Sequence, residues 1–275
     1  MMTQQTVPLM GAALEIKDLE VYRDWLLDGP RDLEIQDPIA PEVLDGDWRT
    51  AARHAREMLR GYTGRLGIHG PFLGLDLAPY DAKVRQLVIE RLRQGLAFAE
   101  AVGATHMVLH SPFLCFGTPA HVFTPFARRE GTIKAARAVI EPLLPQAEAL
   151  DCMLVIETIA DGSVAPLLDL VRSFDTPLVR LSIDVGHVRM MQQIGGPTPD
   201  QWVREAGDLL AHVHLQDTDG HLDRHWAPGD GAINWYAFFT ALQTLAHQPR
   251  LLLELEDHAH IPRGMAYLTR CGFAC

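Results

Sequence analysis

Short apolar runs alternate with amphipathic stretches along this chain, and the alternation constrains the fold more than any other feature. The runs have the length of strands, whereas the stretches between them follow a helical period. Eight strands are predicted: Val7–Leu14, Asp32–Asp37, Arg65–Gly70, His106–Ser111, Cys152–Thr158, Leu178–Asp184, Ala211–Asp217 and Leu251–Glu256. Because repeated strand–helix alternation produces parallel strands joined by right-handed crossovers, we expect an α/β protein with a parallel sheet.

Eight strand–helix units in 275 residues match the size of a (β/α)8 TIM barrel, which needs about 250 residues. The helical stretches include Asp47–Gly61, Tyr80–Val102, Thr132–Leu150 and Asp200–Leu210. An open doubly wound sheet is the alternative, but no GxGxxG fingerprint follows an early strand. No linker or low-complexity tract divides the chain, so we predict a single barrel domain over residues 1–275.

The composition restricts the class of partner and the cellular setting. With 24 Lys and Arg against 35 Asp and Glu, the net charge of −11 argues against a general polyanion-binding surface. The cysteines Cys115, Cys152, Cys271 and Cys275 form no CxxC pair, so we expect a reduced, cytoplasmic setting. The first residues combine no basic region with a long apolar run, so we expect neither a signal peptide nor a membrane partner.

Polar residues end the predicted strands. They are His69 in IHGPF, His110 in LHSPF, Glu157 in VIET, Asp184 and His187 in SIDVGH, His214 in HVHLQD and Glu254 in LLLELED. The long loop after the seventh strand adds Asp223 and His225 in DRHW. Because the carboxyl ends of barrel strands form the catalytic face, these side chains are expected at one mouth.

This concentration of carboxylates and imidazoles predicts a divalent-metal site. Any one of these residues alone is more often an ordinary surface or core residue. Several carboxylates at one mouth would repel each other, and a bound dication removes that cost. Imidazole with carboxylate suits zinc, manganese or iron rather than calcium. We expect zinc, with manganese or magnesium as alternatives, and leave open more than one ion.

Further polar residues are predicted on the inward faces of the strands. His106 and His212 lie deeper than His110 and His214, where they either orient the ligands or are satisfied polar groups of the core. In the second strand, Glu34 and Gln36 alternate with apolar residues and also present polar groups inward.

The strand endings resemble the xylose isomerase-like TIM-barrel superfamily, which contains sugar isomerases, epimerases and endonuclease IV. The segment HLQDTDGHLDRHWAPGDGAINW is similar to the family's His-xx-Asp, Asp-x-His and Pro-Gly-x-Gly stretch. The resemblance to the isomerases and epimerases implies that one metal is held by Glu157, Asp184, His214 and Glu254. In endonuclease IV these positions belong to a trinuclear zinc cluster, whose further ligands match His69, His110, His187, Asp223 and His225.

Other segments differ from the endonuclease pattern. LQDTDG follows His214 where the endonuclease has a basic DSK-type sequence, and IETIAD replaces a Glu-Asn-Thr-Ala-Gly type of run. DNA cleavage requires phosphate contacts from basic side chains or backbone amides. Arg128 and Arg129 form only a short basic run, which Glu130 ends at once.

The resemblance implies a divalent-metal-dependent isomerase or epimerase of a small sugar, sugar phosphate or polyol. Glu157 and Glu254 are the expected base and acid that move a proton through a metal-stabilised enediolate, and His187 contacts metal or substrate. The alternative is an endonuclease IV-like zinc phosphodiesterase acting on abasic DNA, which alone would make nucleic acid a partner. A non-catalytic metal-stabilised barrel is a third hypothesis. The sequence leaves open a homo-oligomer.

Overall fold

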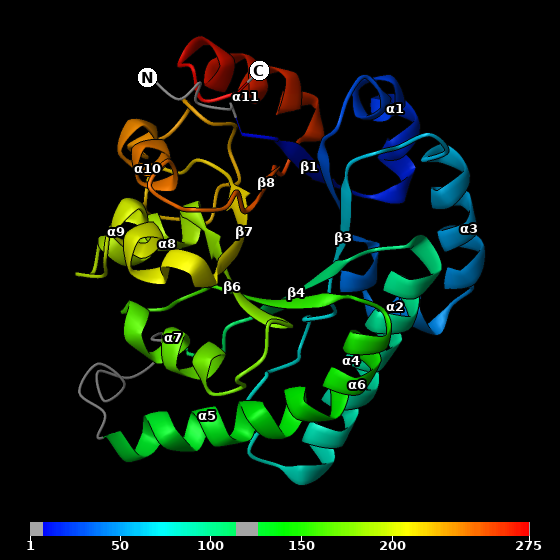
Figure 1. The fold of residues 1–275 in the computed structure, drawn as a ribbon, viewed down its shortest axis with the longest axis vertical. Coiled ribbons are helices and arrows are strands. Elements are labelled where there is room, and N and C mark those ends of the chain that lie inside the picture. The colour runs from blue at the N-terminus through cyan, green and yellow to red at the C-terminus, as the bar shows by residue number, and fades with distance from the viewer. Residues whose placement is uncertain (1–7, 114–125, 275) are drawn as a thin grey trace.

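The computed structural model describes residues 8–113 and 126–274, and these form a closed barrel of eight parallel strands (Figure 1). Each strand pairs with the next in sequence, and the last pairs with the first. The strands are β1 Gly11–Leu14, β2 Asp32–Ile35, β3 Arg65–His69, β4 His106–His110, β5 Met153–Glu157, β6 Val179–Asp184, β7 Leu210–Leu215 and β8 Arg250–Leu253. The predicted barrel is confirmed, and the open sheet is excluded.

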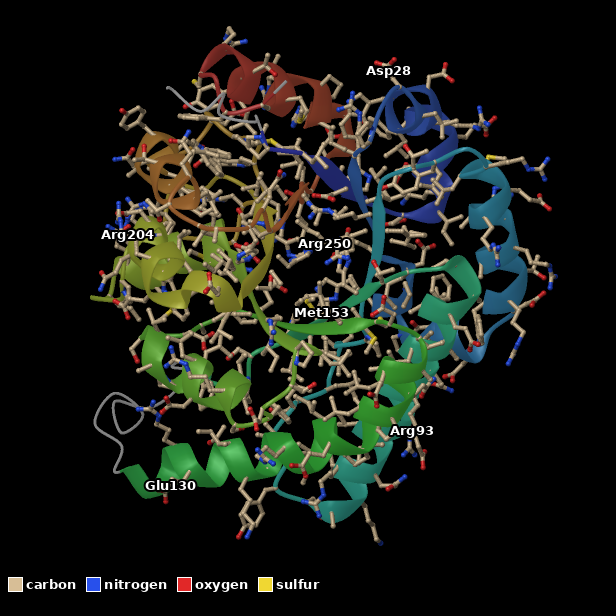
Figure 2. The ribbon with its side chains drawn as sticks, viewed as in Figure 1. Asp28, Arg93, Glu130, Met153, Arg204 and Arg250 are labelled. Atoms are coloured by element: carbon tan, nitrogen blue, oxygen red, sulfur yellow. The ribbon has the colours of Figure 1, made fainter. Side chains whose placement is uncertain are left out.

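Helices surround the ring of strands, as Figure 1 shows. The α-helices are α1 Leu19–Leu27, α2 Pro41–Asp45, α3 Trp48–Met58, α4 Ala82–Val102, α5 Phe126–Ile140, α6 Leu144–Ala149, α7 Val164–Arg172, α8 Val185–Gln192, α9 Pro199–Ala206, α10 Trp235–Leu242 and α11 Ile261–Arg270. Short 3-10 turns lie at η1 Ile16–Asp18, η2 Asp37–Ile39, η4 Glu141–Leu143, η5 Gly207–Leu209 and η6 His258–His260. In Figure 2 the charged side chains of Arg93, Glu130 and Arg204 lie on these outer helices.

The predicted strands agree with the structure to within a few residues at their ends. For the first strand, the prediction began at Val7, which lies outside the described residues, whereas β1 begins at Gly11. The helix predicted over Thr132–Leu150 is wrong as one continuous element. Pro142 and Pro145 lack the backbone N–H that an uninterrupted helix needs, so α5 ends at Ile140 and a 3-10 turn leads into α6.

An ion pair between a buried carboxylate and a partly buried guanidinium closes the end of the barrel opposite the predicted mouth. Arg65 donates from Nε and Nη2 to the two carboxylate oxygens of Asp32, at 2.7 and 2.8 Å. The backbone N–H of Leu251 donates to the same carboxylate at 2.9 Å. Asp32 thereby joins the beginnings of β2, β3 and β8, which fixes their register below the site.

Within the described ranges, no helix is both long enough and apolar enough to cross a membrane.

Candidate metal centre at the barrel mouth

The carboxyl ends of the strands bring the predicted polar residues to one mouth. His69, His110, Glu157 and Asp184 are the last residues of β3, β4, β5 and β6. His214 lies one residue before the end of β7, and Glu254 follows β8 directly. Because all eight strands are parallel, these ends share one rim of the barrel.

All nine predicted ligands fall into three groups whose donor atoms lie within 4.8 Å of one another inside each group. The tetrad consists of Glu157, Asp184, His214 and Glu254. The His69 group consists of His69, His110 and Glu157, and the His187 group consists of His187, Asp223 and His225. Glu157 belongs to two groups, so the tetrad and the His69 group adjoin.

In the tetrad, one imidazole nitrogen faces two carboxylates. Nδ1 of His214 lies 2.7 Å from Oε1 of Glu157 and 3.3 Å from Oε2 of Glu254. Asp184 caps α8, since its Oδ1 accepts from the backbone N–H of His187 at 2.6 Å. This cap fixes the start of α8 through Oδ1 alone, and Oδ2 of Asp184 is buried without a hydrogen-bond partner.

The His69 group lies beside an aromatic wall. Nε2 of His69 and Nε2 of His110 lie 3.5 and 3.7 Å from Oε2 of Glu157. The ring of Phe72 stacks on His110 with a centroid separation of 3.9 Å. Phe72 also lines a small, mainly apolar cavity of about 150 Å³ that reaches His110 and Ser111.

The His187 group depends on the long loop between β7 and α10. The carboxylate of Asp223 lies between two imidazoles, 3.1 Å from Nε2 of His187 and 3.1 Å from Nε2 of His225. Asp217 holds this loop in place. Its carboxylate accepts from the backbone N–H groups of Gly229 and Ile233 and from the indole N–H of Trp235.

Three residues that were not predicted as ligands support the ligands from behind. Gln36 Nε2 donates to Oε1 of Glu254 at 2.6 Å, and Oε1 of Glu34 lies 3.0 Å from Nε2 of His214. Gln216 Nε2 donates to Asp184 and Asp223, at 3.2 and 2.8 Å. The alternation in β2 indicated that Glu34 and Gln36 point inward, but no sequence signal identified their partners.

Burial and neighbouring charges shift the pKa values at the mouth. Burial raises the pKa of Asp184 to about 6 and lowers the pKa of His110 to about 3. For His225, burial opposes protonation, but the carboxylates of Asp223, Glu254 and Asp184 raise the pKa to about 9. At this mouth, close pairing with carboxylates therefore favours the protonated, charged form of an imidazole such as His225.

The residues fit a divalent ion. Oε2 of Glu157 and Oδ2 of Asp184 are buried and have no hydrogen-bond partner, although buried polar atoms are normally paired. Both atoms belong to the tetrad, and carboxylate with imidazole is the donor set that zinc and similar ions prefer. A divalent ion would satisfy these oxygens and reduce the repulsion between the carboxylates.

An open groove adjoins the tetrad on the side of β8. It has a volume of about 660 Å³, and Glu254, His225, Gln36 and Tyr22 lie in its lining. Acidic residues outnumber cationic ones in its lining, which comprises the acidic Glu15, Asp18, Glu254, Glu256 and Asp257 and the cationic Lys17 and His225. Lys17 pairs with Glu15, so the groove presents a negative surface next to the site.

The fold and the mouth define a TIM barrel that carries a candidate metal centre, and the comparisons with known proteins identify its family. The family model "Xylose isomerase-like TIM barrel" matches residues 31–271. The chain belongs to this family, as its strand endings indicated.

Solved structures share the fold across almost the whole chain. A D-tagatose 3-epimerase-like protein is 17% identical with a TM-score of 0.77, over 95% of this chain and 96% of the other. The TTHB071 protein from Thermus thermophilus, solved after soaking with ZnCl2, is 25% identical with a TM-score of 0.72, over 95% and 96%. An uncharacterized protein of Methanocaldococcus jannaschii is 20% identical over 205 residues, which cover 74% of this chain and 68% of that protein.

Proposed function

We propose that the protein is a divalent-metal-dependent isomerase or epimerase of a small, unphosphorylated sugar or polyol. The observation that carries the proposal is the position of Glu254, which belongs to the tetrad and also lines the acidic groove. A substrate in the groove would therefore lie against both the carboxylates and an ion held by them. The name of the D-tagatose 3-epimerase-like neighbour supports carbohydrate as the substrate class.

The tetrad would hold the ion, and zinc is the element that its donors suit best. Bound there, a divalent ion supplies a Lewis acid that stabilises negative charge developing on the substrate oxygens. Asp184 and His214 would act as ligands alone, because Asp184 is fixed as the cap of α8 and His214 is held between Glu34 and Glu157.

Glu157 and Glu254 would move the proton. Glu157 would take a proton from the carbon next to a ketose carbonyl through the carboxylate oxygen that does not bind the ion. Glu254, whose other oxygen is held by Gln36, would return a proton to the substrate. His187 would contact the ion or substrate hydroxyls through Nε2, which faces Asp223 at 3.1 Å, because its Nδ1 is engaged by the carbonyl of Thr158 at 3.0 Å.

The charge of the groove favours a neutral substrate. A phosphate or nucleic-acid backbone would meet the carboxylates of Asp18, Glu256 and Asp257, with Lys17 already paired. Sugar hydroxyls, by contrast, donate hydrogen bonds to carboxylates without a charge penalty. Arg129, from the short basic run, pairs with Asp169 on α7, and the side chain of Arg128 lies outside the described residues.

The test follows exchange of a substrate proton with solvent. Zinc- and manganese-loaded protein is incubated in deuterated water with D-fructose, D-tagatose and D-xylulose, and deuterium at the carbon next to the carbonyl is measured by NMR. We expect metal-dependent incorporation with at least one ketose and a loss of more than about 100-fold in Glu157→Gln. Absence of exchange with all sugars in metal-loaded protein would contradict the proposal.

The second candidate is metal-assisted hydrolysis of a phosphodiester, and one observation favours it. All nine positions that match the endonuclease IV cluster are filled, and the structure gathers them into three adjoining groups. Cleavage of an abasic-site duplex by the zinc-loaded protein, lost in Glu254→Gln, would establish this candidate in place of the isomerase.

A further inference from the structure

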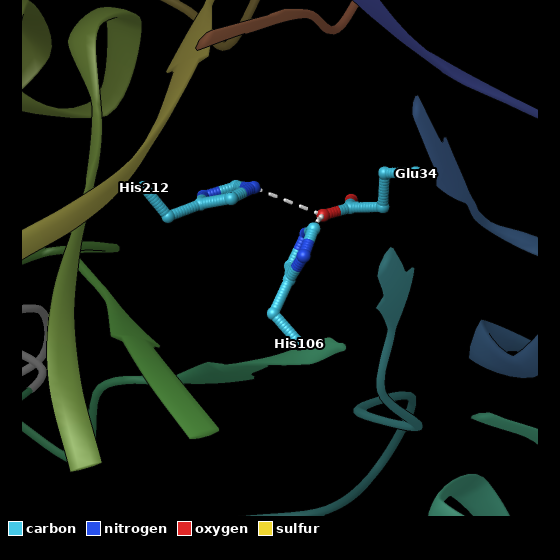
Figure 3. A group of neighbouring side chains, drawn as sticks. All are labelled: Glu34, His106 and His212. Carbon is cyan, nitrogen blue, oxygen red and sulfur yellow. Dashed lines mark ion pairs between the residues drawn. The ribbon is translucent and has the colours of Figure 1, made fainter. Parts of the chain in front are cut away.

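A second cluster of metal-ligating side chains lies inside the barrel, below the mouth. Glu34 comes from β2, His106 from β4 and His212 from β7, and all three are completely buried. Figure 3 shows the two imidazole rings converging on one oxygen of the Glu34 carboxylate. None of the three belongs to the tetrad, the His69 group or the His187 group.

The separations of the donor atoms match those around a tetrahedral ion. Oε2 of Glu34 lies 3.1 Å from Nε2 of His212 and 3.5 Å from Nε2 of His106. Ligands about 2.0–2.2 Å from zinc lie roughly 3.3 Å from one another in tetrahedral geometry. Both separations from Glu34 are close to this value, and the donor atoms of all three side chains lie within 4.8 Å of one another.

The same atoms have no hydrogen-bond partner in the described structure. Oε2 of Glu34, Nε2 of His212 and both ring nitrogens of His106 are buried and unpaired by hydrogen bonds. The contact of His106 nearest to pairing is therefore the 3.5 Å approach of its Nε2 to Oε2 of Glu34. These unpaired atoms come from three buried side chains and lie close together, and a metal ion that accepts electron pairs from all three side chains would satisfy them.

The remaining atoms of the cluster are held in place by neighbours. Nδ1 of His212 lies 2.8 Å from Oγ of Ser182, and Oε1 of Glu34 lies 3.0 Å from Nε2 of His214. Partners of this kind orient metal-binding imidazoles and carboxylates. Gly67 on β3 makes the space for His106, since a Cβ atom there would overlap the imidazole ring.

We propose that Glu34, His106 and His212 form a further divalent-metal site, distinct from the mouth and suited to zinc. The ion cross-links β2, β4 and β7 through the interior of the barrel. Glu34 also connects this site to the mouth, because its second carboxylate oxygen contacts His214. The interior ion is structural, and its binding does not depend on the reaction proposed for the mouth.

The experiment counts and locates zinc in the full chain. Chelator-stripped wild type and His106→Leu are saturated with zinc chloride, freed of excess metal by gel filtration and analysed by plasma mass spectrometry. We expect one equivalent of zinc fewer per chain in His106→Leu. His54→Leu, which removes an exposed histidine of α3, is the matched control and keeps the wild-type count.

Anomalous scattering at the zinc edge from crystals of the wild type gives a second, variant-free measurement. We expect a peak between Glu34, His106 and His212. A map without a peak there, or equal zinc counts in folded wild type and His106→Leu, overturns the proposal. Catalytic activity enters neither measurement, so failure of the proposed function leaves this test unaffected.

Discussion

At the mouth, four of the five imidazoles are oriented by contacts to the ring nitrogen that faces away from the cluster. Nδ1 of His69, His187 and His225 lies 2.9–3.0 Å from the backbone carbonyls of Gly70, Thr158 and Glu254, respectively. This arrangement presents Nε2 of these rings to the site. His214 is reversed, because Glu34 engages its Nε2 and leaves Nδ1 facing Glu157 and Glu254. Such contacts fix tautomer and direction before any ion binds.

Gln216 offers a test of this support. Its amide donates to both Asp184 and Asp223, and Met has a similar size without the donor. We expect Gln216→Met to weaken zinc binding at the mouth by about 10–100-fold, measured by competition with a chromogenic chelator. Gln201→Met, on the exposed surface of α9, is the control and leaves the affinity unchanged. Wild-type affinity in Gln216→Met would show that the amide does not hold the ligands.

Asp161 makes the stability of the metal-free chain depend on pH. Burial raises its pKa from 3.8 to about 7, and it accepts from Ser111 Oγ and the backbone N–H of Ile159. Between these two values the folded chain binds more protons than the unfolded chain, so this group's contribution to stability falls as pH rises from about 4 to about 7.

The substitution Asp161→Asn removes this dependence, since the amide does not ionise; its oxygen can accept from the N–H of Ile159 while its NH2 group donates to Oγ of Ser111. We expect the variant to have a higher free energy of unfolding than wild type at pH 8, with the difference vanishing near pH 4. Urea unfolding of chelator-treated protein at both pH values measures it. Parallel pH profiles for the two proteins would contradict the raised pKa.

Among the elements, the connection between β7 and α10 determines whether the His187 group can form. Asp223 and His225 lie on this loop, and His225 has a left-handed backbone with φ of 45°. The loop is attached by the antiparallel bridge between Asp217 and Trp226 and by the Asp217 carboxylate. The positions of two predicted metal ligands, Asp223 and His225, thus depend on the buried Asp217, which is not among the predicted ligands.

Removal of that carboxylate tests the attachment of the loop. Asp217→Ala leaves the N–H groups of Gly229, Ile233 and Trp235 unpaired, so we expect a loss of about 2–4 kcal/mol in the free energy of unfolding. Asp230→Ala removes a more exposed partner of Arg263 on the same loop and is expected to cost at most about 1 kcal/mol. Equal effects of the two substitutions in urea unfolding would rule out this role.

In the whole molecule, different residues organise the two ends of the closed barrel. The mouth carries the candidate chemistry, whereas the opposite end is held by the Arg65–Asp32 pair across β2, β3 and β8. Arg65 also donates to the backbone carbonyls of Gln248 and Pro249, just before β8. Stability can therefore be changed at this end without touching the mouth.

Asp32→Ala leaves the partly buried guanidinium of Arg65 without its carboxylate, so we expect a loss of about 3–5 kcal/mol in thermal or urea unfolding. Asp45→Ala breaks a similar two-bond pair with Arg91 on the exposed surface, and a much smaller loss of stability is expected. A loss below about 1 kcal/mol in Asp32→Ala would contradict the role of this pair in closure.

The barrel and the residues at its rim could be predicted from the sequence because both follow from patterns within short segments of the chain. Alternating strands and helices define the fold, and the ends of parallel strands share an edge, which places residues such as His69 and Glu157 together. Contacts across the barrel interior join residues far apart in the sequence, so no pattern within a short segment predicts them. Glu34 meets His214, and His106 meets Glu34, only because the closed barrel sets β2, β4 and β7 around one axis.

The measurement that tests the central claim most directly is the metal content of the mouth. Chelator-stripped wild type and Asp184→Asn are saturated with zinc, and bound zinc per chain is determined after removal of free metal. Oδ2 of Asp184 has no partner within the described structure, and we expect the variant to lose at least one equivalent while it remains folded. An equal zinc content in both proteins, or no zinc in the wild type, would contradict a metal centre built on the tetrad.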